Sequence, residues 1–167
     1  MIGHLVRIPE ETRVLLHAEP EKIEELLYSD FEEERVAEDD DLDIDKTWHV
    51  LHFLFTGFAW DGGFPAGFLL SCGEPVGDVD VGYGPARSFT PREVKQISQF
   101  LTNLKPAAVR DRLKPALMKK FEIYPGPWKG DEKVEEEWPY FEGGLEDTIA
   151  FVREAAEKDL ALLVYIG

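Results

Sequence analysis

The sequence predicts an α/β fold: a single-domain, three-layer αβα sandwich with a mixed sheet, spanning 1–167. The chain has 167 residues, the length of one ordinary domain. Residues 2–8 alternate loosely between apolar and polar, and 160–167 form a continuous apolar run typical of a strand buried on both faces. Amphipathic, helix-like segments fill the sequence between these two strands. Strands at both ends with helices between favour helices layered on a sheet.

The first part of the chain predicts a strand followed by two helices. Pro9 opens a polar helix, and Pro20 suits the first turn of a second helix, where a missing N–H costs little. The acidic run 31–41 comes next. Because its like charges repel one another, we expect this run to be a flexible loop.

Residues 42–57, LDIDKTWHVLHFLFTG, predict a buried helix. Asp45 is the expected N-cap, since its carboxylate can accept from N–H groups of the first turn. Apolar residues then recur every three or four positions from Trp48 to Phe55, which defines one helical face. Gly57 stands where a left-handed C-terminal cap would fall.

Two histidines lie three apart on this helix, at His49 and His52. They could bind metal or move protons, because imidazole titrates near neutrality. A zinc site needs three or four protein ligands, but His4, His17 and Cys72 belong to other segments. We therefore predict no metal site and favour buried histidines hydrogen-bonded to the backbone. Cys72 lacks a flanking nucleophile signature and is interpreted as a small buried hydrophobe.

A glycine- and proline-rich region, 58–85, follows the helix and ends in GYGPAR, 82–87. Its density of glycine and proline predicts tight turns, with one or two turns of helix at 67–72. Tyr83 could stack on a ring, and the planar fork of Arg87 suits a carboxylate or phosphate. The alternative is a turn in which Arg87 pairs with an acid of the fold, Asp78 or Asp80. No phosphate-binding or dinucleotide fingerprint is present.

The second half predicts a short strand at 86–90 and a helix that begins after Thr90. Pro91 and Glu93 stand at the first and third positions, the spacing of a capping box. Further expected elements are two short helices opened by prolines, a turn-rich connection, a long helix bent or broken by two glycines, and the terminal strand. The two short helices begin at Pro106 and Pro115, and the connection covers 121–130. The long helix covers 132–158, with its glycines at Gly143 and Gly144, and the terminal strand covers 160–167.

Charge is unevenly distributed along this acidic chain. The net charge is −16; residues 10–45 hold 16 acids and 3 bases, whereas residues 86–129 hold 3 acids and 10 bases. Such acidity disfavours nucleic acid, because binding phosphates requires clustered lysine and arginine. We expect no cofactor and no membrane partner. The single cysteine and the absence of a signal sequence predict a cytoplasmic protein.

Three stretches together resemble the YfbM-like family of bacterial proteins of unknown function. They are LDIDKTWHVLHFLFTG, GDVDVGYGPARSFTPREV and EIYPGPW. The resemblance covers nearly the whole chain and implies a three-layer α/β sandwich, but no known reaction. The family's recurring positions map to Asp43, Asp45, Lys46, Trp48, His52, Gly57, Gly82, Tyr83, Gly84, Pro85, Ala86 and Arg87.

Two functions remain open, and neither enzyme activity nor oligomeric state is fixed by the sequence. The first is a binding module whose acidic surface takes a basic protein partner, steered by charge. The alternative is an enzyme or a binder of a small anionic ligand, with a cleft between the 45–57 helix and the 82–87 loop. The alternative needs His52, Tyr83 and Arg87 to converge within roughly 10 Å. The candidate binding residues are Asp45, Lys46, Trp48, His52, Tyr83 and Arg87.

Overall fold

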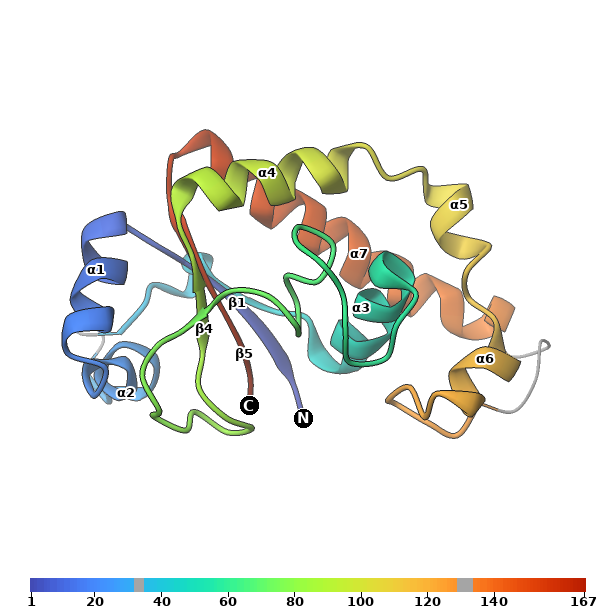
Figure 1. Cartoon of the computed structure of the whole chain (residues 1–167), viewed down its shortest axis with the longest axis horizontal. Helices are drawn as coiled ribbons and strands as arrows, with labels where there is room; N and C mark the ends of the chain where they lie inside the picture. The colour runs from blue at the N-terminus through green and yellow to red at the C-terminus, as the bar shows by residue number, and fades with distance from the viewer. Residues whose placement is uncertain (32–34, 129–133) are drawn as a thin grey trace.

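The computed structural model describes residues 1–31, 35–128 and 134–167, and places helices on both sides of a sheet (Figure 1). The strands are β1 (Gly3–Ile8), β2 (Asp41–Asp43), β3 (Glu74–Pro75), β4 (Arg87–Phe89) and β5 (Ala161–Ile166). The helices are α1 (Glu10–Ala18), α2 (Lys22–Tyr28), α3 (Trp48–Thr56), α4 (Pro91–Thr102), α5 (Pro106–Arg110), α6 (Pro115–Lys120) and α7 (Val134–Glu157). Two 3-10 turns, η1 (Glu38–Asp40) and η2 (Asp45–Thr47), complete the described elements.

The sheet has the strand order β2-β1-β5-β4-β3, and each pairing in the described residues is antiparallel. The prediction of an α/β sandwich is confirmed, but the prediction of a mixed sheet is wrong. The first and last strands pair with each other, with Leu5 opposite Val164. Because both strands come from far ends of the chain, no local turn determined their relative direction, and the sequence pattern could not reveal it.

Each face of the sheet packs against its own set of helices, which gives the predicted three layers. On one face, Leu5, Leu162 and Val164 join a core built with α3, α4 and α7. On the other face, alternate residues of the same strands join a smaller core with α1 and α2. This period-two division explains why β5 is apolar throughout: its odd and even positions are both buried.

Arg7 is the charged exception in the central strands and is only 5% exposed. Its guanidinium pairs with Asp40 at 3.0 Å and with Glu154 of α7 at 2.6 Å, and it also donates to the Asp39 carbonyl. The same group lies 4.2 Å from the centre of the Phe151 ring. Arg7 therefore ties the acidic run to the sheet and to α7.

The acidic run is more ordered than predicted where it is described. Residues 38–40 form η1 and residues 41–43 form β2, which pairs with β1. Like-charge repulsion is overcome here because Arg7 supplies a buried counter-charge. Residues 32–34 of the run lie outside the described residues.

The 42–57 prediction is right about the buried helix and its end but wrong about its start. Gly57 adopts the expected left-handed conformation, with φ of 79°. Asp45 does not act as a side-chain cap; it lies at φ of 46° in η2, and its amide donates to the Asp43 carboxylate at 2.6 Å. The α-helix itself begins three residues later, at Trp48.

Four further predictions can be compared with the structure. The capping box at Thr90 and Glu93 is present in both directions, and the two short helices begin at their predicted prolines. Residues 67–72 form turns rather than an assigned helix. The two glycines do not break α7, which runs continuously through them.

Candidate functional site

The two histidines of α3 are fully buried and hydrogen-bonded to backbone groups. His49 is held through both ring nitrogens, at 2.8 Å from the Ala59 carbonyl and 3.0 Å from the Tyr124 amide. His52 contacts the Asp61 carbonyl through Nε2 at 3.0 Å. Burial lowers the pKa of both, and brings that of His52 to about 4. The expectation of backbone-bonded core histidines is confirmed.

Arg87 also points inward, and it pairs with neither Asp78 nor Asp80. Its guanidinium donates to the carbonyls of Leu69 and Cys72, the latter at 2.9 Å. Burial lowers its pKa to about 10, so it stays charged at neutral pH. Arg87 is close enough to His52 to lower that histidine's pKa further. These two predicted site residues come together, with Arg87 serving to fasten the 67–72 turns.

Tyr83 does not join them. Its side chain is 66% exposed, while its backbone amide donates to the Ile166 carbonyl at 3.0 Å. The surrounding turn is held by the Asp80 carboxylate, which accepts from the amides of Gly82 and Gly84 at 2.8 and 2.9 Å. Gly82 is required here, because a Cβ would lie 2.8 Å from the Ile166 carbonyl oxygen. The turn thus docks against the end of β5.

Asp45 and Lys46 form a separate polar group with Tyr140 of α7. The Tyr140 hydroxyl donates to the Asp45 carboxylate at 2.8 Å and accepts from the Lys46 amide at 3.2 Å. Partial burial and the Asp45 contact raise the pKa of Tyr140 to about 12. Trp48 is 2% exposed and stacks on His49. The six predicted binding residues are therefore distributed over several places.

A third group resembles a catalytic arrangement but lacks its geometry. His17 Nε2 lies 2.7 Å from the Ser88 hydroxyl and 3.7 Å from a Glu74 oxygen. In a catalytic triad the acid holds the other ring nitrogen, so that the base faces the serine in one tautomer. Here both groups contact the same nitrogen, and Ser88 is only 2% exposed. The arrangement fits a structural link between α1 and β4.

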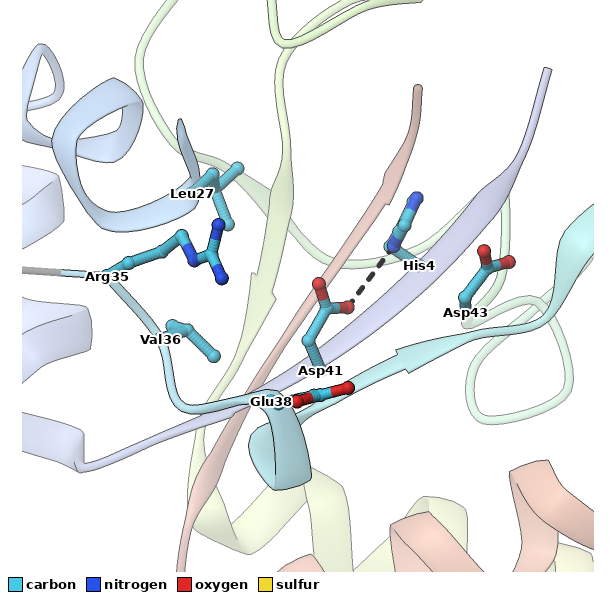
Figure 2. Close-up of a pocket in the computed structure, with 7 residues that line it drawn as sticks. All are labelled: His4, Leu27, Arg35, Val36, Glu38, Asp41 and Asp43. Carbon is cyan, nitrogen blue, oxygen red and sulfur yellow. Dashed lines mark hydrogen bonds and ion pairs between the residues drawn. The ribbon is translucent and has the colours of Figure 1, made fainter. Parts of the chain in front are cut away.

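A cavity lies between β1, β2 and the end of α2 (Figure 2). It has a volume of about 400 Å³, within the range of small-ligand pockets. Its lining comes from β1, β2, α2, η1 and the segment before η1: His4, Leu27, Arg35, Val36, Glu38, Asp41 and Asp43. We call this cavity the acidic pocket, because three carboxylates face a single guanidinium.

The polar wall of the acidic pocket is set by strand pairing. Asp41 and Asp43 are two apart on β2, so both project from the same face of the strand. His4 lies on β1, with Nδ1 3.2 Å from an Asp41 oxygen, and its ring stacks on Tyr165 at 4.7 Å. Burial, followed by the nearby charge of Asp41, raises the pKa of Tyr165. Negative potential is therefore concentrated at this rim.

Leu27 and Val36 lie on the side of the pocket opposite Asp41 and Asp43, with the Arg35 guanidinium between them (Figure 2). An apolar wall facing an acidic wall suits a long side chain that carries a cation at its tip. Within the described ranges, no group of three or more His, Cys, Asp or Glu side chains is arranged to hold a metal ion. The arrangement suits binding of a cationic group.

Sequence reasoning did not find this pocket. The family positions include Asp43, but no sequence pattern connects it with His4, Glu38 and Asp41. The available signal was the alternation in Asp41–Asp43, where two acids flank a leucine as in a half-buried edge strand. Because the neighbouring residues are acidic too, the alternation of this short strand does not stand out in the sequence.

The fold is shared with a known protein. The family model described as "Domain of unknown function (DUF1877)" matches residues 1–165. This chain belongs to the DUF1877 family. Among solved structures, the DUF1877 chain is similar to the protein of unknown function YfbM from Escherichia coli, with a TM-score of 0.76 and 21% identity over 98% of each chain. That level of identity supports a shared fold, and the predicted YfbM-like family is confirmed.

No curated protein matches this DUF1877 chain. In the parts of the chain that the structure describes, no helix has both the length and the apolar character needed to cross a membrane.

Proposed function

We propose that this DUF1877 protein is a binding module whose acidic pocket takes a lysine or arginine side chain of a basic partner. The lining of the pocket is the observation that supports this proposal. Glu38, Asp41 and Asp43 supply three carboxylates, and Arg35 supplies one positive charge. A cationic tip gains charge-assisted hydrogen bonds from such a lining.

The charge distribution of the chain supports the same conclusion. Residues 10–45 carry 16 acids and 3 bases, and this segment provides much of the pocket wall. A field of one sign around a concave site raises the encounter rate of an oppositely charged partner. Because exposed charges are screened by salt, that rate should fall as ionic strength rises.

The apolar part of the pocket favours a side chain over a free inorganic cation. Leu27 and Val36 can cover the methylene groups of a lysine or arginine, while the carboxylates hold its tip. His4 is fixed between the Asp41 carboxylate and the Tyr165 ring, so the polar wall is formed before the ligand arrives. A preformed wall lowers the entropic cost of binding.

The test is titration of the protein with a short oligolysine peptide and with an oligoarginine peptide, monitored by calorimetry and by amide chemical shifts. We expect shifts at residues of β1, β2 and the end of α2. The double variant Asp41→Asn/Asp43→Asn should raise the dissociation constant about tenfold or more. A tenfold rise is equivalent to a loss of about 1.4 kcal/mol of binding free energy. Glu11→Gln/Glu21→Gln, which removes the same charge from α1 and the α1–α2 connection, is the matched control.

Equal losses of affinity in the two double variants would contradict the proposal, because binding would then depend on net charge alone. Chemical shifts spread over the whole acidic surface, without focus on the pocket, would contradict it as well. A short oligoglutamate peptide should produce no shifts at the pocket at the same ionic strength.

A further inference from the structure

An exposed aromatic surface lies far from the acidic pocket, beside α3 and α6. We call it the aromatic–basic strip and define it by Trp60, Lys119, Lys120, Phe121 and Tyr124. Trp60 is 63% exposed and Phe121 is 40% exposed. The Lys120 ammonium is 5.5 Å from the centre of the Phe121 ring. Large exposed aromatic side chains grouped in this way mark an interaction surface.

The strip is continuous because its rings pack on consecutive turns of one helix. The centres of the Trp60 and His49 rings are 4.3 Å apart, and the Tyr124 backbone amide donates to the same histidine. The centres of the Phe121 and Phe53 rings are 5.9 Å apart, and Phe53 lies one helical turn beyond His49. The buried α3 residues therefore hold the exposed rings in a fixed row, already arranged to receive a partner.

The complementary surface is present on the same chain. We call it the acidic–aromatic tip and define it by Glu24, Glu25, Tyr28, Asp30 and Phe31, at the end of α2. Phe31 is 68% exposed and Tyr28 is 52% exposed. The Tyr28 hydroxyl donates to the Val81 carbonyl at 2.7 Å, which fixes that ring in place. The tip pairs exposed aromatics with acids, whereas the strip pairs exposed aromatics with lysines.

We propose that the aromatic–basic strip docks the acidic–aromatic tip of a second copy of this chain. The ends of α2 and α6 lie at opposite ends of the long axis (Figure 1). Two copies laid side by side in opposite directions would bring the tip of each against the strip of the other. The contact is then made twice about a twofold axis, so the assembly closes as a dimer and does not grow into a filament.

Local chemistry, and not net charge, drives this association. Each copy has a net charge of −16, so the two copies repel at long range. At roughly 0.15 M salt the Debye length is about 8 Å, which screens that repulsion but leaves contact pairs effective. Burying the aromatic rings on both sides removes on the order of 1,000 Å² from water, the size of a weak specific interface.

The experiment is sedimentation velocity on the full chain over a range of concentrations at physiological ionic strength. We expect a reversible monomer–dimer equilibrium in the micromolar range or weaker. Lys119→Glu/Lys120→Glu and Phe31→Ala should each weaken dimerisation about tenfold or more. These residues are exposed, so both variants should fold, which circular dichroism verifies. Arg92→Glu, on the exposed face of α4, reverses a charge outside the strip and should leave dimerisation unchanged.

A charge exchange identifies the two surfaces as partners. Glu24→Lys/Glu25→Lys should weaken self-association, and mixing it with Lys119→Glu/Lys120→Glu should restore it in a mixed dimer that has one contact of exchanged sign. A wild-type chain that remains monomeric at all concentrations would overturn the proposal. So would a dimer that tolerates both the Lys119/Lys120 reversal and Phe31→Ala. Loss of oligolysine binding in the Asp41/Asp43 variant would not alter either result, so the two proposals fail separately.

Discussion

Several polar side chains in this protein are held by backbone carbonyls. Arg87 binds carbonyls of the 67–72 turns, and Arg112 donates to the Leu54 carbonyl at 2.6 Å at the end of α3. His49 and His52 contact carbonyls of the connection that follows α3. Irregular segments have carbonyls without strand or helix partners, and these side chains satisfy them. These polar side chains thus supply hydrogen bonds where the chain turns and regular secondary structure does not.

His52 should make stability depend on pH in the mildly acidic range. Burial lowers its pKa from 6.5 to about 4 in the folded state, so the unfolded chain binds more protons between these values. Its contribution is therefore fully present above pH 6.5 and is lost as pH falls to about 4. We expect a loss on the order of 2–3 kcal/mol, measured by urea unfolding at successive pH values.

The His52→Gln variant isolates this effect, because glutamine can still donate to the Asp61 carbonyl but does not titrate. The variant should be less stable than wild type at neutral pH, and the difference should shrink toward pH 4. Parallel pH profiles for the two proteins would show that other groups cause the loss.

At the scale of elements, the N-terminus of α4 is fixed by a reciprocal cap. The Thr90 hydroxyl accepts from the Glu93 amide at 3.3 Å, and the Glu93 carboxylate accepts from the Thr90 amide at 2.8 Å. Thr90→Ala should cost about 1 kcal/mol of unfolding free energy, since it leaves amides of the first turn without a partner. Thr90→Ser preserves the cap. Its free energy of unfolding, measured by chemical denaturation, should stay within about 0.3 kcal/mol of the wild-type value.

The two glycines of α7 provide a matched pair of substitutions. A Cβ at Gly143 meets no atom within 4 Å, whereas a Cβ at Gly144 would lie 2.7 Å from the Thr47 hydroxyl oxygen of η2. Gly143→Ala should therefore stabilise the protein by about 0.5–1 kcal/mol through helix propensity. Gly144→Ala should destabilise it by about 1–3 kcal/mol because the helix must move away from η2. If both variants shift the thermal unfolding midpoint in the same direction, this account is contradicted.

Elements with a local signal could be predicted from the sequence, and elements defined by distant contacts could not. Thr90, Pro106 and Pro115 each identified a helix start, because caps and prolines act within one turn. β2 is three residues long and exists by pairing with β1, so it has no strong pattern of its own. The acidic pocket was missed for this reason. The sequence predicts His52 and Arg87 as candidate binding residues, and in the structure both contact backbone carbonyls. Sequence alone does not distinguish a buried anchor from a ligand contact.

For the whole molecule, the high negative charge opposes compaction. The net charge of −16 creates self-repulsion over distances that salt screens readily. The Arg7 pairs with Asp40 and Glu154 are short and one partner is buried, so they are screened much less. Raising salt from about 0.01 to 0.15 M should therefore increase stability. Urea unfolding midpoints test this, because urea adds no charge; a midpoint that falls with salt would show that exposed ion pairs dominate.

The central pair of the sheet has a consequence for how the chain acquires its structure. β1 and β5 pair along their whole length, yet nearly the entire sequence separates them. A ribosome therefore synthesises β1 long before its principal partner exists, and the apolar residues of β1 have no sheet to join in the meantime. Structures dominated by such distant pairings form slowly, because the connecting chain must lose its entropy first. The apolar residues of β1 therefore stay without their sheet partner until the last strand emerges.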